Sequence, residues 1–205
     1  TRLPDFWVDV HSERANQSIQ FALRKKTDKS KKNLANQSKL DLLVFGDPQP
    51  KNNQDVGYYE KDIVEPIIGH EQAELGISLG DIVHGNLSLY PAMNRVTARL
   101  KTPWLHVAGN HDRDYGAAND ESSLATFSKY YGPDTFAWEE SGVSIIALDD
   151  VVHEPNSGVP AKYVGGLRES QFQFLQSYLG RLPKTRRIIL AMHIPVFDAD
   201  ASPDK

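Results

Sequence analysis

The sequence contains five strand-length runs that are almost continuously apolar, and each run ends in polar residues. The runs occupy residues 40–45, 75–79, 104–108, 143–148 and 187–192. A strand with one exposed face alternates apolar and polar side chains, whereas a strand covered on both faces stays apolar throughout. The runs therefore predict a mostly parallel or mixed sheet with other layers against it, which means an α/β fold.

Segments between these runs carry apolar residues at helical spacing. They cover residues 58–72, 87–100, 124–131 and 169–181. Pro91 stands near the start of the second segment, where a helix tolerates proline, and Gly180 stands where the last segment should end. Residues 136–148 differ, because a Ser-Gly pair separates two strand-like halves, and this pattern predicts a β-hairpin.

Residues 1–39 have a different character from the rest of the chain. FWVDV (6–10) and SIQFAL (18–23) resemble short strands, and the basic run RKKTDKSKKN (24–33) is typical of a solvated linker. We therefore predict that residues 1–39 are the end of an upstream β module plus a basic linker. The second domain covers residues 40–205.

Composition excludes several classes of protein. The net charge is −4, so no basic field indicates a nucleic-acid partner. The chain has no cysteine, which excludes disulfides, thiolate metal sites and a cysteine nucleophile. No apolar run approaches the roughly 20 residues that span a bilayer, so we expect a soluble protein without a membrane span. The compartment stays open, an extracytoplasmic bacterial one included.

The polar residues that follow the apolar runs have the chemistry of a metal site. They are Gly46-Asp47-Pro48-Gln49, Gly80-Asp81, Gly109-Asn110-His111-Asp112, Asp149-Asp150 and His193. If the five runs are neighbours in one sheet, these residues meet at the carboxyl ends of the strands. Carboxylates, amide oxygens and an imidazole suit Mn, Mg or Fe more than a structural zinc. A cation would also relieve the repulsion between Asp47 and Asp81.

The motifs GDPQ, GDIVHGN, GNHD and AMHIP occur in this order between residues 40 and 198. Together they resemble the calcineurin-like metallophosphoesterase superfamily. The resemblance implies a layered α/β/β/α sandwich as the catalytic domain over residues 40–205. It also implies two divalent metal ions (Mn, Fe, Mg or Zn) and a phosphorylated substrate. The reaction would be hydrolysis of a phosphate ester by a hydroxide held between the two ions.

The resemblance also implies a role for each motif residue. The implied metal ligands are Asp47, Gln49, Asp81, Asn110 and His193. Asp47 would bind the first ion, Asp81 would bridge both ions, and Asn110 and His193 would bind the second. Gln49 stands where the common pattern has histidine, which marks an Asp-x-Gln branch that includes proteins resembling bacterial Ser/Thr phosphatases.

Two further residues of the GNHD motif are expected to serve catalysis. His111 would lie beside the phosphate, and Asp112 would hydrogen-bond His111 and fix its orientation. The family pattern ends in Gly-His-x-His, and no such motif follows His193. We therefore expect a C-terminally truncated domain that lacks the last histidine ligands.

Several alternatives stay open at this point. The first hypothesis is a phosphomonoesterase that resembles protein Ser/Thr phosphatases. The others are a phosphodiesterase or nucleotide pyrophosphatase at the same site, and a binding protein that keeps the fold without catalysis. His84 is either a substrate contact or a loop histidine, and Asp149 either lines the site or caps a strand. The expected substrate walls are the loops 50–58, 113–121 and 150–166.

Overall fold

The structure is a computed structural model, and it describes residues 39–69, 73–156, 158 and 162–196. The two strands and the basic run expected within residues 1–39 lie outside this part of the chain. The division into an upstream module and a second domain therefore stays a prediction.

The first sheet contains three parallel strands. They are β1 (Leu42–Phe45), β2 (Leu75–Leu79) and β3 (Trp104–Val107), in the order β1-β2-β3. The central strand β2 is buried at four of its five positions. This explains why its sequence shows no alternation of apolar and polar residues.

The second sheet combines the predicted hairpin with the last apolar run. It contains β4 (Phe136–Glu140), β5 (Val143–Ala147) and β8 (Arg187–Ala191). Strand β4 is antiparallel to β5, and β8 is parallel to β5. Ser141 and Gly142 form the turn of the hairpin with positive φ angles of 48° and 76°, as a tight turn between antiparallel strands requires.

The five apolar runs therefore belong to two sheets, so the single sheet considered as a condition for the convergence of their polar ends does not form. The sheets face each other across a shared apolar cluster. This cluster contains Leu75, Ile77 and Val107 from the first sheet and Val143, Ile145, Ala147 and Ala191 from the second. A strand covered by another sheet on one face and by helices on the other is apolar on both faces. A strand covered by helices on both faces is apolar in the same way. The apolar runs alone do not distinguish the two arrangements.

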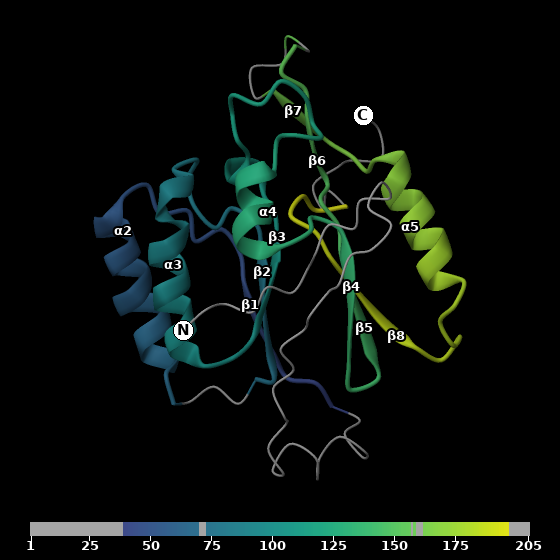
Figure 1. Cartoon of the computed structure of the whole chain (residues 1–205). Coiled ribbons are helices and arrows are strands. Elements are labelled where there is room, and N and C mark those ends of the chain that lie inside the picture. Colours follow the sequence, from purple (N-terminus) through teal and green to yellow (C-terminus); the bar gives the residue numbers. More distant parts are fainter. Residues whose placement is uncertain (1–38, 70–72, 157, 159–161, 197–205) are drawn as a thin grey trace, which may run out of the picture.

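Helices cover the outer face of each sheet (Figure 1). The helices are α2 (Asn53–Tyr58), α3 (Tyr90–Thr97), α4 (Ala125–Tyr131) and α5 (Glu169–Leu179). Helices α2 and α3 lie outside the first sheet, and α5 lies outside the second. The order of layers is thus α/β/β/α, which confirms the expected sandwich.

The first helix begins earlier than the apolar pattern predicts. The side chain of Asn52 accepts hydrogen bonds from the backbone N–H groups of Gln54 (2.8 Å) and Asp55 (3.1 Å), which fixes the start of α2. The helix continues as a π-helical segment (Tyr59–Val64) and a 3-10 turn (Glu65–Ile67). The predicted segment 87–100 is helical throughout, because 3-10 turns at Leu87–Leu89 and Ala98–Leu100 flank α3.

The expected loop 150–166 contains two short strands. Strands β6 (Val151–His153) and β7 (Tyr163–Gly165) pair antiparallel as a two-stranded ribbon. Three-residue strands carry too little periodicity to be read from a sequence.

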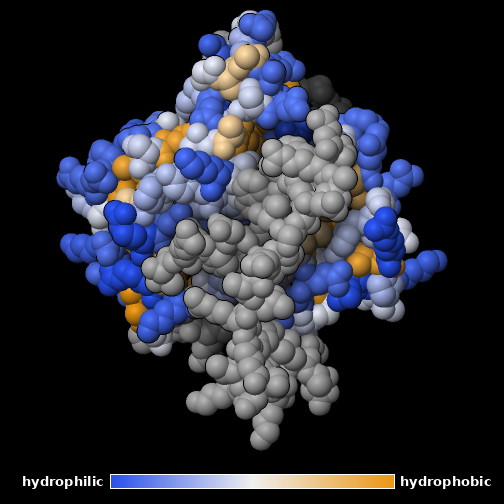
Figure 2. All heavy atoms as spheres, in the orientation of Figure 1, coloured by the Kyte–Doolittle hydropathy of each residue, from blue (hydrophilic) through white to orange (hydrophobic). Residues whose placement is uncertain are grey.

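The described surface is polar, with apolar residues on several different elements. Figure 2 shows one face, on which the apolar residues form separate patches. The exposed apolar residues include Val44 on β1, Phe172 on α5 and Leu190 on β8. Among the described residues, no helix is both long and apolar enough to cross a membrane.

The ends of β2 and β3 approach each other more closely than side chains normally allow. A Cβ atom added to Gly109 would lie 2.2 Å from Asp81 Oδ1 and 2.3 Å from the Asp81 backbone nitrogen. A Cβ atom added to Gly46, at the end of β1, would have no atom within 4 Å. Of these two glycines, packing therefore requires Gly109 and does not require Gly46.

Replacing Gly109 by alanine is expected to destabilise the protein, because the new methyl group overlaps backbone atoms that cannot move independently. Gly109→Ala should lower the free energy of unfolding by about 1–3 kcal/mol, measured by urea denaturation. The matched variant Gly46→Ala should stay within about 0.5 kcal/mol of the wild type. Equal unfolding midpoints for the two variants would show that the turn after β3 tolerates a side chain.

His106 on β3 is half-buried as a whole, but its Nδ1 is enclosed. Among the described residues this nitrogen has no hydrogen-bond partner. Its ring lies against Tyr131, with the ring centroids 4.2 Å apart. Desolvation lowers the pKa of His106 to about 3, because an imidazolium here would lose its hydration.

This histidine should make the protein less stable in acid. The unfolded chain binds a proton below pH 6.5, whereas the folded protein binds it only near pH 3. The contribution of the neutral His106 ring to the free energy of unfolding is therefore fully present above pH 6.5. It is lost at about 1.4 kcal/mol per pH unit as the pH falls toward 3. In urea denaturation from pH 7.5 to 5, His106→Phe should show a correspondingly shallower loss of stability than the wild type. Parallel curves for the two proteins would refute the assignment.

Candidate metal centre

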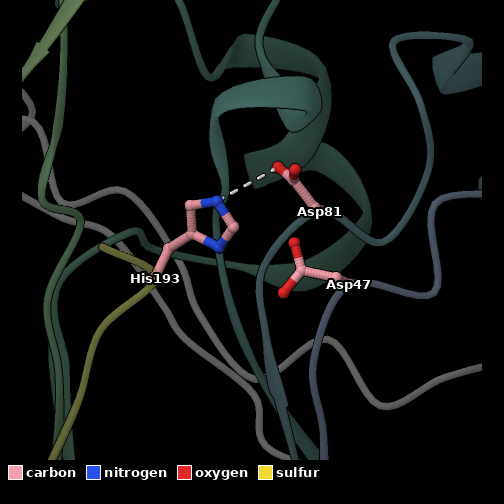
Figure 3. Close-up of side chains that lie close together, drawn as sticks. All are labelled: Asp47, Asp81 and His193. Carbon is pink, nitrogen blue, oxygen red and sulfur yellow. Dashed lines mark ion pairs between the residues drawn. The ribbon is translucent and has the colours of Figure 1, made fainter. Parts of the chain in front are cut away.

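Three chain segments that follow strands bring metal-binding side chains to one place. Asp47 follows β1, Asp81 follows β2, and His193 follows β8 (Figure 3). One ligand atom from each residue lies within 4.8 Å of the other two. Asp47 and Asp81 have positive φ angles of 51° and 52°, a left-handed conformation that aspartate adopts more readily than most residues. The chain therefore turns sharply after each of these strands.

His193 presents its unprotonated nitrogen to the other residues. Its Nδ1 donates to the Leu79 carbonyl oxygen at 2.9 Å, so Nε2 carries the lone pair in the neutral ring. Nε2 lies 3.1 Å from Asn110 Oδ1 and 3.5 Å from Asp81 Oδ1. Three acceptor atoms thus face one another without a proton among them when the imidazole is neutral.

The chain also fixes the backbone around His193. The carboxylate of Asp150 accepts the backbone N–H of His193 at 3.2 Å and that of Ile194 at 3.0–3.1 Å. Asp150 therefore holds the turn that follows β8. The sequence shows Asp150 only as one half of an Asp-Asp pair, and nothing in the pattern assigns it this role.

Gln49 joins the same cluster through its amide nitrogen. Nε2 donates to Asp47 Oδ1 at 3.3 Å and also to Asp81 Oδ2. Gln49 Oε1 lies 3.4 Å from His84 Nδ1. A half-turn of the amide exchanges its oxygen and nitrogen, and this would present the oxygen to the cluster as a metal ligand requires.

These residues fit a divalent cation. The set contains two carboxylates, one imidazole lone pair and the Asn110 oxygen, and all of these atoms are acceptors. Asp81 is only 1% exposed, so little water screens its charge. A cation among these atoms would satisfy them together, and the oxygen-rich composition suits Mn, Mg or Fe. The structure thus brings together all five residues that the sequence nominates as ligands: Asp47, Gln49, Asp81, Asn110 and His193.

His111 lies beside this cluster, and it is held by Tyr115, a residue that the sequence motifs do not nominate. His111 Nδ1 pairs with the Tyr115 hydroxyl at 2.8 Å, and its Nε2 is 4.0 Å from Asp81 Oδ2. His84 stacks on the same ring, with the centroids 4.1 Å apart. Desolvation lowers the pKa of His111, Asp81 opposes this shift, and His84 adds to it. The only sequence signal for Tyr115 is its position four residues after His111.

The predicted hydrogen bond between Asp112 and His111 is not formed, and this expectation is wrong. Asp112 is fully buried, and its carboxylate accepts from the backbone N–H groups of Ile82 (3.1 Å) and Gly109 (2.9 Å) and from the Tyr90 hydroxyl (3.0 Å). Burial raises the pKa of Asp112 to about 7, and these three donors oppose the shift. Asp112 closes the 3-10 turn at Asn110–Asp112, and its side chain points into the core.

The two residues left open by the sequence have different surroundings. His84 is half-buried beside Gln49 and His111, at the edge of the cluster. Asp149 is buried away from it, where its carboxylate pairs with Arg168 (3.1 Å) and accepts the backbone N–H of Val151 (3.1 Å).

Comparison with known proteins gave one family and several solved structures. The calcineurin-like phosphoesterase family matches residues 40–204. Eleven solved chains match, and one of them is a dimetal phosphatase from Danio rerio. It is 18% identical, with a TM-score of 0.49, and the match covers 77% of this chain and 70% of that one. Comparison with curated protein sequences gave no match.

The family match spans the four motifs and every residue of the metal-binding cluster. The chain therefore belongs to the calcineurin-like phosphoesterases, hydrolases of phosphate esters that use divalent metal ions.

Proposed function

We propose that this phosphoesterase is a phosphomonoesterase whose metal ions are held by Asp47, Gln49, Asp81, Asn110 and His193. The observation that supports this set is the convergence of acceptors at His193 Nε2. Asn110 Oδ1 lies at 3.1 Å and Asp81 Oδ1 at 3.5 Å from that nitrogen. A cation among acceptors gathered this closely would relieve their mutual repulsion.

Two bound divalent ions supply the positive charge that a phosphate ester needs for attack by water. The chain contributes the positions of the ligands. Asp81 is held by the backbone N–H of His111, which donates to Oδ1 at 2.8 Å. His193 is held by the Leu79 carbonyl oxygen, which keeps the lone pair on Nε2 directed at the cluster.

His111 is proposed to donate a hydrogen bond to a phosphoryl oxygen. This role assigns the neutral ring its proton on Nε2, the nitrogen on the side of Asp81, and in that tautomer the Tyr115 hydroxyl donates to Nδ1. Because its pKa is lowered, the ring is neutral near pH 7. A neutral imidazole stabilises charge through a hydrogen bond and gives up its proton reluctantly.

The donors beside the cluster favour a monoester over a diester. His84 and His111 lie together at its edge, and their imidazole rings carry N–H groups able to donate hydrogen bonds. A monoester has three non-bridging oxygens and a larger negative charge than a diester, so it uses more donors. A phosphoserine or phosphothreonine peptide is one substrate of this class.

Asp81→Asn should abolish most of the activity, because it removes the charge from the residue proposed to bridge both ions while keeping its shape. With Mn²⁺ and an aryl phosphate, kcat should fall at least about 100-fold. Asp62→Asn, an exposed aspartate in the π-helical segment, is the matched control and should leave kcat unchanged. Activity that survives Asp81→Asn would remove this site from the reaction.

The same assay separates the alternatives. An aryl diester hydrolysed faster than the monoester would favour a phosphodiesterase. Binding of Mn²⁺ without hydrolysis of either ester would favour a protein that keeps the fold without catalysis.

Asn110 and His111 should separate metal binding from catalysis, because only Asn110 is proposed as a ligand. In calorimetric titration, Asn110→Ala should weaken Mn²⁺ binding by about 10- to 100-fold. His111→Asn should bind Mn²⁺ like the wild type but lose about 100-fold or more in kcat, as expected for loss of one donor to the phosphoryl group. Weakened Mn²⁺ binding in His111→Asn would contradict the assignment.

A further inference from the structure

Arg113 directly follows the GNHD motif, and its side chain lies inside the protein. It is 1% exposed and belongs to the largest fully buried side chains among the described residues. A guanidinium taken out of water costs free energy unless its N–H groups find partners. The partners of Arg113 therefore indicate what this buried charge does.

The first partner is the peptide bond between Asn110 and His111. Arg113 Nε donates to the Asn110 carbonyl oxygen at 2.9 Å. The N–H group of the same peptide, which belongs to His111, donates to Asp81 Oδ1 at 2.8 Å. Arg113 and Asp81 thus hold opposite edges of one peptide plane. That plane carries the proposed metal ligand Asn110 on one side and His111 on the other.

The second partner is His153 on β6. Arg113 Nη1 donates to His153 Nδ1 at 2.7 Å and to the Lys162 carbonyl oxygen at 3.1 Å. His153 Nε2 donates to the Ala117 carbonyl oxygen at 3.1 Å. Since arginine only donates and a carbonyl only accepts, these contacts select the neutral ring with its proton on Nε2.

The third contact is with two tyrosine rings. The guanidinium carbon lies 4.6 Å from the ring centre of Tyr163 on β7 and 5.5 Å from that of Tyr115. Tyr115 is the residue whose hydroxyl pairs with His111 Nδ1 at 2.8 Å. Arg113 therefore reaches His111 by two routes, through the peptide and through Tyr115.

The ribbon that carries His153 is itself fixed to the loop after the motif. The backbone N–H of His153 donates to Asp120 Oδ1 at 2.6 Å, and Asp120 Oδ2 pairs with Arg168 at 3.2 Å. His153 is 3% exposed. The pair of Arg113 and His153 is thus linked through Asp120 to Arg168.

We propose that Arg113, held by His153, is a positioning residue that sets the orientation of Asn110 and His111 for metal and substrate. The inference rests on the function proposed above. It extends that function to the β6–β7 ribbon, because the contact between His153 on β6 and Arg113 connects the ribbon to the proposed site. A residue that only fills the core would change stability, whereas a positioning residue also changes metal affinity and kcat.

The test compares two ways of breaking the contact. Arg113→Met keeps the apolar stem and removes the donors. His153→Leu removes the acceptor, and His153→Gln keeps an acceptor oxygen. Both Arg113→Met and His153→Leu should weaken Mn²⁺ binding, measured by calorimetry, and lower kcat by about 10- to 100-fold. His153→Gln should stay closer to the wild type in both measurements.

Two controls accompany these variants. Arg95→Met, an exposed arginine on α3, should leave Mn²⁺ affinity and kcat unchanged. The double variant Arg113→Met with His153→Leu should match Arg113→Met alone in Mn²⁺ affinity and kcat. The reason is that each change breaks the same contact between Arg113 and His153. If Arg113→Met does not fold, the His153 pair decides the question by itself.

Hydrogen exchange of the His111 amide in the metal-free protein tests the inference independently of the proposed function. Loss of the Arg113 contact should speed this exchange at least about tenfold. Faster exchange supports the inference even if the wild-type protein binds no Mn²⁺, an outcome that counts against the metal ligands alone. Folded Arg113→Met and His153→Leu variants with wild-type exchange, Mn²⁺ affinity and kcat would overturn the proposal.

Discussion

The site depends on holding several hydrogen-bond acceptors close together, and within the described part of the chain Asp81 pairs with no lysine or arginine. Two carboxylates, an amide oxygen and an imidazole lone pair repel one another and prefer water. The chain keeps them in place through backbone contacts. Asp81 accepts the His111 amide, His193 donates to the Leu79 carbonyl, and Asp150 anchors the His193 backbone. These partners sit at strand ends, so the sheets determine where the acceptors can lie.

The close approach of two strand ends makes this arrangement possible. Gly109 leaves room for Asp81, and Asp112 then fills the space below the turn with its buried carboxylate. Asp112 satisfies donors from the turns after both strands, Ile82 and Gly109, and also the Tyr90 hydroxyl. The GNHD motif therefore packs the turn after β3 against the turn after β2. The side chains of Asn110 and His111 extend from this motif toward the cluster.

Much of the fold and the cluster could be predicted from the sequence, because both depend on local patterns. Apolar runs indicated the strands, and the residue types after them indicated the metal chemistry. What failed depends on contacts between distant residues. The partners of Asp112 come from Ile82 and Tyr90, about 22 to 30 positions away, and no spacing rule connects them. The division into two sheets was expected from the family resemblance and could not be read from the apolar runs, since apolarity reports burial without naming the covering layer. Tyr115 and Arg113 were missed because their contacts with His111 and His153 are made by side chains outside the motifs, and no sequence pattern marks them.

The candidate ligands come from both halves of the sandwich. Asp47, Asp81 and Asn110 follow strands of the first sheet, and His193 follows a strand of the second. An ion held by Asp81 and Asn110 together with His193 would act as a cross-link between the sheets, in addition to the apolar cluster that joins them. Occupancy and folding would then be thermodynamically linked, since a ligand that binds only the native state stabilises it by mass action. A catalytic cofactor would in this way also help to keep the two sheets docked, and ion depletion would loosen the sandwich at the end where the chemistry takes place.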